Sequence, residues 1–225
     1  KRKFIILVLV SLSIFAKEKE YKCGLKKEAF QATIYCKKTY LYILTNKNWY
    51  EVALTNYGGA FAAIMVPDKD GKFQNIVQGH DCIDSVRNSP EKFLSTLVGR
   101  YGNRINKGKF KLKGKDYTLA LNAETNHMHG GPTGFHVRVW DAVQPNEHEV
   151  KLTYVSPDGE EGYPGTLTME VTFSLNDNNE LKLSYRGKTD KTTIVNMTHH
   201  VFFNLHGLTD PCPPIEDHVL TLNSN

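Results

Sequence analysis

Four side chains suited to binding and proton transfer lie in one glycine-rich stretch, residues 99–135. They are Arg100, Arg104, His127 and His129, and the stretch also contains seven glycines. Glycine lets the backbone adopt a positive φ or approach a ligand closely, which residues with a Cβ resist. Arginine binds hydroxyl groups, and histidine exchanges protons near neutral pH. The stretch therefore predicts a site for ligand binding and acid–base chemistry.

A metal centre is the first alternative for the histidines of this stretch. His127 and His129 are two residues apart, so on a strand their side chains would point the same way. Paired histidines of this kind bind metal in cupin-like barrels. That arrangement needs a carboxylate ligand within a few residues, whereas Gly-Gly-Pro-Thr-Gly follows at 130–134. We therefore expect no metal here.

A second group of histidines lies near the end of the chain. His199 and His200 are adjacent, so on a strand they face opposite sides and only one can face a given pocket. A single strand histidine is more often structural than catalytic. His200, however, is followed by aromatic residues and Asn204, and rings with amides are typical of a sugar site. We select His200 and Asn204 as site candidates.

The loop at 158–165 carries the carboxylates of Asp158, Glu160 and Glu161. Turn formation and solvation account for most clusters of this kind. We therefore give these carboxylates no catalytic role.

The elements that must position these residues are strands. Residues 166–175 alternate apolar and polar side chains, which indicates one buried and one solvated face. Similar patterns predict further strands, and no convincing helix exceeds two turns. Many short strands separated by Gly/Pro turns indicate an all-β sandwich. The expected strands are 49–54, 61–66, 75–78, 109–112, 116–121, 137–143, 149–155, 166–175, 180–186, 193–204 and 219–222, with one helical turn at 90–94.

The first 39 residues differ from the rest of the chain. Three basic residues precede an apolar run at 4–15 and then Ala16, which is the layout of a secretory signal peptide at 1–16. The run is too short for a comfortable transmembrane helix. We expect secretion, with a cytoplasmic location as the alternative, and a leader of uncertain order at 17–39. Cys23 and Cys36 either form a disulfide in the secreted protein or remain free thiols.

The overall charge excludes some partners. The formal net charge is +4, but the first three residues supply three of those charges and leave 25 basic against 24 acidic residues. This balance lacks the basic footprint of a nucleic-acid or membrane-surface protein. We expect a small-molecule ligand and leave the oligomeric state open.

Four motifs follow one another along the chain: Gly99-Arg100-x-x-Asn103-Arg104-Ile105, His129-Gly130-Gly131, the 158–165 loop and His200-x-x-Phe203-Asn204-Leu205. Their order resembles the aldose 1-epimerase, or galactose mutarotase, family, particularly its secreted plant-type branch. The resemblance covers residue 56 to the end, within a domain that we place at 40–225. Four ordered motifs are specific, although each alone is weak.

The resemblance implies a large antiparallel β-sandwich of the galactose mutarotase type, which interconverts the α and β anomers of free aldohexoses without a cofactor. It implies that His200 is the acid that protonates the ring oxygen and that His129 supports it. Asn103 and Arg104 would hold sugar hydroxyls, and Asn204 would line the same site.

Two departures from the family pattern affect the activity. His199 stands where the family usually has asparagine, and its charge would influence His200. The family's glutamate base and a substrate-binding aspartate match no residue, so we expect a C-terminally incomplete chain. The alternative function is a catalytically impaired sugar-binding relative. A phosphorylated substrate would need basic residues beyond Arg100 and Arg104, and we find no such cluster.

Overall fold

The computed structural model describes residues 20–223. The expected signal segment 1–16, and residues 17–19 of the expected leader, lie outside the described residues. Two four-stranded antiparallel sheets form the body of this part of the chain. The first sheet has the order β3 (Leu41–Thr45), β4 (Glu51–Thr55), β5 (Phe61–Pro67) and β6 (Phe73–Asn75). The second has the order β12 (Asp141–Asn146), β13 (Glu149–Ser156), β14 (Leu167–Leu175) and β15 (Leu181–Thr189).

Shorter elements connect the two sheets and build their ends. The two-stranded pairs are β1 (Ala32–Ile34) with β2 (Lys37–Thr39), β7 (Leu97–Val98) with β16 (Thr198–His199), β8 (Arg104–Ile105) with β11 (His127–Met128), and β9 (Lys109–Leu112) with β10 (Lys115–Thr118). The helices are α1 (Ile83–Asn88) and the 3-10 turns η1 (Lys27–Phe30), η2 (Asn106–Gly108), η3 (Phe135–Val137) and η4 (Glu160–Gly162). No helix within residues 20–223 is long and apolar enough to cross a membrane.

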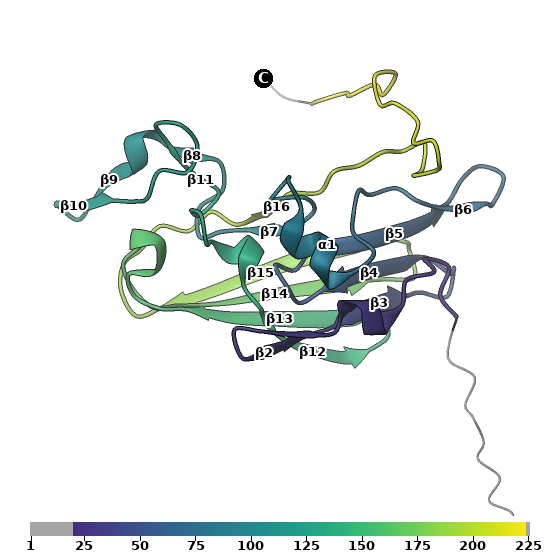
Figure 1. Cartoon of the computed structure of the whole chain (residues 1–225), viewed down its shortest axis with the longest axis horizontal. Helices are drawn as coiled ribbons and strands as arrows, with labels where there is room; N and C mark the ends of the chain where they lie inside the picture. Colours follow the sequence, from purple (N-terminus) through teal and green to yellow (C-terminus); the bar gives the residue numbers. More distant parts are fainter. Residues whose placement is uncertain (1–19, 224–225) are drawn as a thin grey trace, which may run out of the picture.

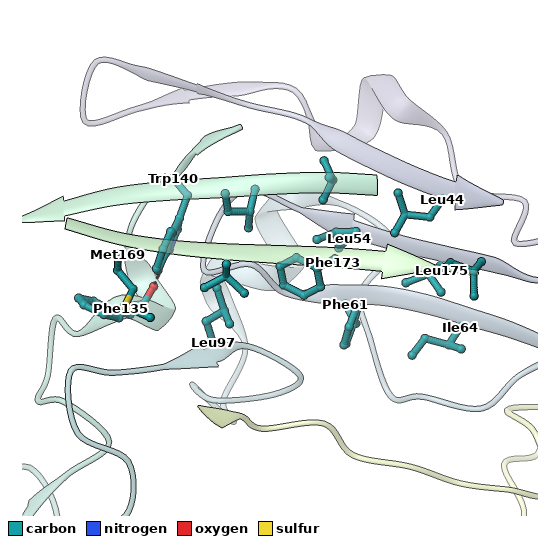
Figure 2. Close-up of a cluster of buried hydrophobic side chains, with 14 of the residues drawn as sticks. Leu44, Leu54, Phe61, Ile64, Leu97, Phe135, Trp140, Met169, Phe173 and Leu175 are labelled. Atoms are coloured by element: carbon teal, nitrogen blue, oxygen red, sulfur yellow. Dashed lines mark hydrogen bonds between the residues drawn. The ribbon is translucent and has the colours of Figure 1, made fainter. Parts of the chain in front are cut away.

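The core lies between the two large sheets. Strand β14 alternates buried apolar residues with half-buried polar ones along its whole length, as its sequence predicts. Phe61 of β5 meets Phe173 of β14 edge to face at 5.5 Å, so the two sheets contact each other through aromatic rings. Figure 2 shows Leu44, Leu54 and Phe61 facing Phe173 and Leu175, with Trp140 and Phe135 at one end of the core. The expected all-β sandwich is confirmed.

The structure corrects several element boundaries. Residues 193–204 form only the two-residue strand β16, because their backbone bridges three different partners: Tyr101, β7 and Val77. The helix lies at Ile83–Asn88, before the expected helical turn at 90–94, and the chain then makes a simple turn. Residues 137–143 begin in η3, so β12 starts only at Asp141. Residues 219–222 form no strand.

Residues 20–39 pack on the first sheet. Phe30 is fully buried in a cluster with residues of β3, β4 and β5. Glu51 of β4 accepts hydrogen bonds from the backbone N–H groups of Lys22 and Cys23, at 2.9 and 3.0 Å. Cys23 and Cys36 are both free thiols, which is the second of the two states expected for them.

Two ends of the sandwich carry different loops (Figure 1). The small pairs β8–β11 and β9–β10 extend from one end, and the described chain begins near the other. The catalytic candidates His129 and His200 follow β11 and β16, so β7, β8, β11 and β16 position them.

Candidate active site

A close backbone contact joins the two halves of the glycine-rich stretch. Gly130 has a φ of +86°, and a Cβ built on it would lie 1.8 Å from the carbonyl oxygen of Gly99. Any larger residue is therefore excluded on both steric and conformational grounds. The contact places the loop after β11 directly against the end of β7.

This arrangement brings His129 and His200 together. Their ring centroids are 5.1 Å apart and the rings are nearly perpendicular, at 83°. The backbone of His200 is fixed by its N–H, which donates to Thr96, and by its carbonyl, which accepts from Ser95. Two histidines that are 71 positions apart in the sequence thus form one imidazole pair.

The tautomer of His129 follows from its hydrogen bond. The backbone N–H of Asn103 donates to Nδ1 of His129 at 3.0 Å, so Nδ1 carries the lone pair and the proton of the neutral ring is on Nε2. Burial lowers the pKa of His129, and the nearby His200 and Arg104 lower it further. The neutral ring of His129, which presents an Nε2–H donor, is therefore favoured over the charged ring.

His127 is not a partner of His129 in this site. His129 has a φ of +52°, and this left-handed backbone breaks the strand alternation that would have aligned the two rings. His127 is fully buried; its Nδ1 lies 2.7 Å from the carbonyl of Ala120 and its Nε2 lies 2.7 Å from the Tyr163 hydroxyl. The expectation that the two rings face the same way is wrong. His127 instead joins the backbone of Ala120 to the Tyr163 hydroxyl in the protein interior.

The proposed sugar ligands occupy different places. Asn103 and Arg104 are exposed beside His129, and the Arg104 guanidinium makes a long 3.4 Å contact with Oδ1 of Asn103. Asn204 is buried and points to another loop: its Nδ2 donates to the carbonyl of Pro213, and its Oδ1 accepts from the N–H of His206. The structure thus brings Asn103 and Arg104 to the histidine pair, while the Asn204 side chain is bonded to the 206–213 segment.

Arg100 has a structural role next to the site. Its side chain is only 2% exposed. The guanidinium donates to the hydroxyl and carbonyl of Ser156 and to the carbonyls of Pro157 and Pro164. It therefore anchors the 156–164 loop and is not available to a ligand.

The two glutamates of that loop are engaged as well. The carboxylate of Glu160 accepts from Tyr154 and Ser156 and pairs with Arg138 at 3.0 Å. The carboxylate of Glu161 accepts from the backbone and hydroxyl of Thr133. These contacts show that both carboxylates stabilise the loop. Neither carboxylate is directed at the histidine pair.

One aromatic residue contacts the site in a way that the sequence does not reveal. The ring of Phe93 lies 4.7 Å from His129, 6.3 Å from His200 and 4.4 Å from His136. His136 is buried, and burial lowers its pKa to about 4. Phe93 therefore provides an apolar surface against which three imidazole rings lie. Its neighbour Glu91 supplies a negative charge that acts on His129.

His199 points into the core, opposite to His200. Its ring packs on Phe61 at 4.3 Å and on Phe173 at 6.0 Å, and its Nε2 lies 3.0 Å from the Gly59 carbonyl. Its Nδ1 is buried and has no hydrogen-bond partner among the described residues. Burial lowers the pKa of His199 to about 4. The adjacent histidines thus face opposite sides, as strand alternation predicts.

Comparison with known families decides the classification, because residues 40–225 match the family model described as aldose 1-epimerase. The chain belongs to the aldose 1-epimerase family. It is 40% identical over 171 residues to a galactose mutarotase of Mus musculus, covering 76% of this chain and 48% of that protein. It is 35% identical over 167 residues to an aldose 1-epimerase of Escherichia coli, covering 74% of this chain and 48% of that protein.

Solved structures of this family have the same fold. An aldose epimerase homologue from C. elegans superposes with a TM-score of 0.71 at 30% identity, covering 74% of this chain and 51% of the other. A galactose 1-epimerase from Lactobacillus acidophilus gives a TM-score of 0.69 at 29% identity, covering 77% and 51%. The chain spans about half the length of the curated relatives it matches.

Proposed function

We propose that this chain interconverts the α and β anomers of a free aldohexose, glucose or galactose, by acid–base ring opening and closure. The observation that carries the proposal is the contact between His129 and His200, at 5.1 Å between ring centroids. Relatives named galactose mutarotase and aldose 1-epimerase support the same reaction class.

Anomerisation requires two proton transfers. The ring oxygen gains a proton and the C1 hydroxyl loses one, so the C1–O5 bond breaks and an aldehyde forms. Rotation about C1–C2 and closure on the other face, with both protons returned, give the other anomer. No net proton or electron is exchanged.

His200 is suited to the donor role. No hydrogen bond to its imidazole occurs within residues 20–223, so its ring nitrogens are available to a sugar. His129 is suited to the supporting role, because its Nε2–H can donate to a sugar oxygen while Asn103 holds its Nδ1. The exposed Asn103 amide and Arg104 guanidinium then bind hydroxyl groups at the rim.

The group that accepts the C1 hydroxyl proton is harder to assign than the proton donor. Within the described residues, no carboxylate is hydrogen-bonded to His129 or His200. Glu91 acts on His129 through its charge, while its Oε1 accepts from the Phe93 N–H at 3.0 Å. We propose that solvent water accepts this proton. We accordingly expect catalysis to be slow, since a positioned base contributes about 10²–10⁴-fold.

The lack of a positioned base among the described residues favours one alternative function, which is a sugar-binding relative with little turnover. The two functions differ in a simple experiment, in which the optical rotation of freshly dissolved α-galactose is followed with and without the protein. Faster equilibration supports the epimerase. Saturable binding of methyl β-galactoside, which has no free C1 hydroxyl, together with an unchanged rate supports the binding protein.

We also propose that residues 1–16 direct secretion in the manner of the plant-type branch. The support is the order of a basic segment, an apolar run and a small residue.

A further inference from the structure

A concave surface lies at the end of the sandwich remote from the histidine pair. The cavity has a volume of about 520 Å³, within the range of about 300–1,000 Å³ that small-molecule sites occupy. It is formed where the β3–β4, β12–β13 and β14–β15 turns meet the start of the described chain. Figure 2 shows Leu175, which lies two residues before the cavity-lining Asp177, at the opposite end of the core from Phe135, which packs against Gly99.

Trp49 is the distinguishing feature of this cavity. It is 67% exposed, although burial of an indole ring is strongly favourable. Its backbone has a φ of +67°, a left-handed conformation that is unfavourable for a bulky residue. An exposed aromatic ring held at such a position is an outlier from which a functional hypothesis can be drawn.

The turn that carries Trp49 is rigidly held. The buried Asn46 accepts from the N–H groups of Asn48 and Tyr50 through its Oδ1. Its Nδ2 donates to the Asn176 carbonyl and to Asn179, both at 2.9 Å. Two neighbouring turns are thus bonded together through one side chain, so the backbone that carries the indole is held in place. A rigid ring loses little entropy when a ligand stacks on it.

The other side chains around the cavity are polar and of both signs. Lys47 pairs with Asp177 at 3.5 Å, and the buried Glu51 accepts two backbone N–H groups. His148 bonds to the Thr45 carbonyl through Nδ1, and half of its side chain remains exposed. Mixed charges give no strong field for a simple ion, whereas donors and acceptors beside an aromatic face suit a neutral polyhydroxylated molecule.

We propose that this cavity is a second saccharide-binding site, in which Trp49 stacks on one face of a pyranose ring and His148, Lys47 and Asp177 contact its hydroxyl groups. The site does not depend on the proposed catalytic pair, since it shares no residue with it. We expect it to accept oligosaccharides, and also glycosides that have no free anomeric hydroxyl.

The chain allows a direct test, because it has only two tryptophans. Trp140 is fully buried and Trp49 is exposed, so acrylamide quenching of fluorescence reports chiefly on Trp49. We expect maltotriose and methyl β-glucoside to protect the chain saturably against acrylamide. Ligand-observed NMR should show the same binding, weakened about tenfold or more in Trp49→Ala.

Matched variants distinguish binding at Trp49 from binding elsewhere on the chain. Tyr35 is another exposed aromatic residue at a positive-φ turn, so Tyr35→Ala should leave binding unchanged. His200→Asn should also leave it unchanged, which distinguishes this site from the catalytic pair. His148→Ala provides a second disruption if Trp49→Ala fails to fold. No protection by either saccharide, or equal binding by wild type and a folded Trp49→Ala, would overturn the proposal.

Discussion

The half-buried His199, whose ring packs against the core, makes the stability of the fold depend on pH in a way that can be calculated. Its folded-state pKa is about 4, because the ring is desolvated against Phe61 and Phe173 and the charge of the neighbouring His200 lowers the pKa further, while the hydrogen bond with the Gly59 carbonyl acts in the opposite direction. In the unfolded chain the pKa returns to about 6.5. The unfolded state therefore binds a proton first as the pH falls. The stability contributed by the neutral ring is complete above pH 6.5 and is lost progressively down to pH 4.

The size of the effect follows from these two values. At pH 5 the unfolded histidine is almost fully charged while the folded one is mostly neutral, and the difference corresponds to about 2 kcal/mol. This is a large part of the stability of about 5–15 kcal/mol that is typical of a domain. With an m-value of about 2 kcal/mol/M, the urea midpoint should move by about 1 M.

The assay compares urea unfolding of the wild type and His199→Asn at pH 8 and pH 5. Asparagine keeps a polar group near the Gly59 carbonyl but does not titrate in this range. The variant should be less stable at pH 8, because it loses its ring contacts. Its deficit relative to the wild type should shrink by about 2 kcal/mol at pH 5. If both proteins lost the same stability between the two pH values, His199 would not be buried as a neutral ring.

Three further predictions follow from the structure. Gly130→Ala should destabilise the chain by more than about 2 kcal/mol in urea unfolding, whereas Gly114→Ala, with a φ of +80° but open space around it, should cost about 1 kcal/mol; equal losses would refute the clash with Gly99. Phe93→Ala should lower the mutarotation rate about tenfold by freeing the imidazoles, and Phe93→Leu should lower it less; unchanged rates would remove Phe93 from the site. N-terminal sequencing of protein exported from a eukaryotic host should begin near Lys17, and an intact Lys1 would contradict secretion.

Local patterns were sufficient for much of the sheet structure. The alternation along β14 reflects both the strand period and its real position between core and surface, so sequence and structure agree there. The opposite orientation of His199 and His200 follows from the same period. Residues 193–204 show where this reasoning fails. The segment has the sequence pattern of a strand, but its backbone bridges three different partners and only two of its residues form a strand.

The site was less predictable than the sheets. The left-handed backbone of His129 occurs beside the close approach of Gly130 to Gly99, and no local sequence pattern reveals that approach. Phe93 reaches the imidazoles only because the turn after α1 packs against the β11 loop. The Asn103 contribution to His129 comes from its backbone N–H, and residue type carries no information about that bond.

The central claim is that His200 donates the proton for ring opening while His129 assists it. Polarimetry on freshly dissolved α-galactose at pH 7 tests this with four proteins: wild type, His200→Asn, His129→Asn and His206→Asn. The last is a matched control, because His206 follows on the same segment but is paired with Asp217 at 2.6 Å. We predict that wild type and His206→Asn accelerate equilibration equally, that His200→Asn removes the acceleration, and that His129→Asn retains part of it. Equal losses at the two histidines, or a wild-type rate equal to that of buffer, would contradict the account.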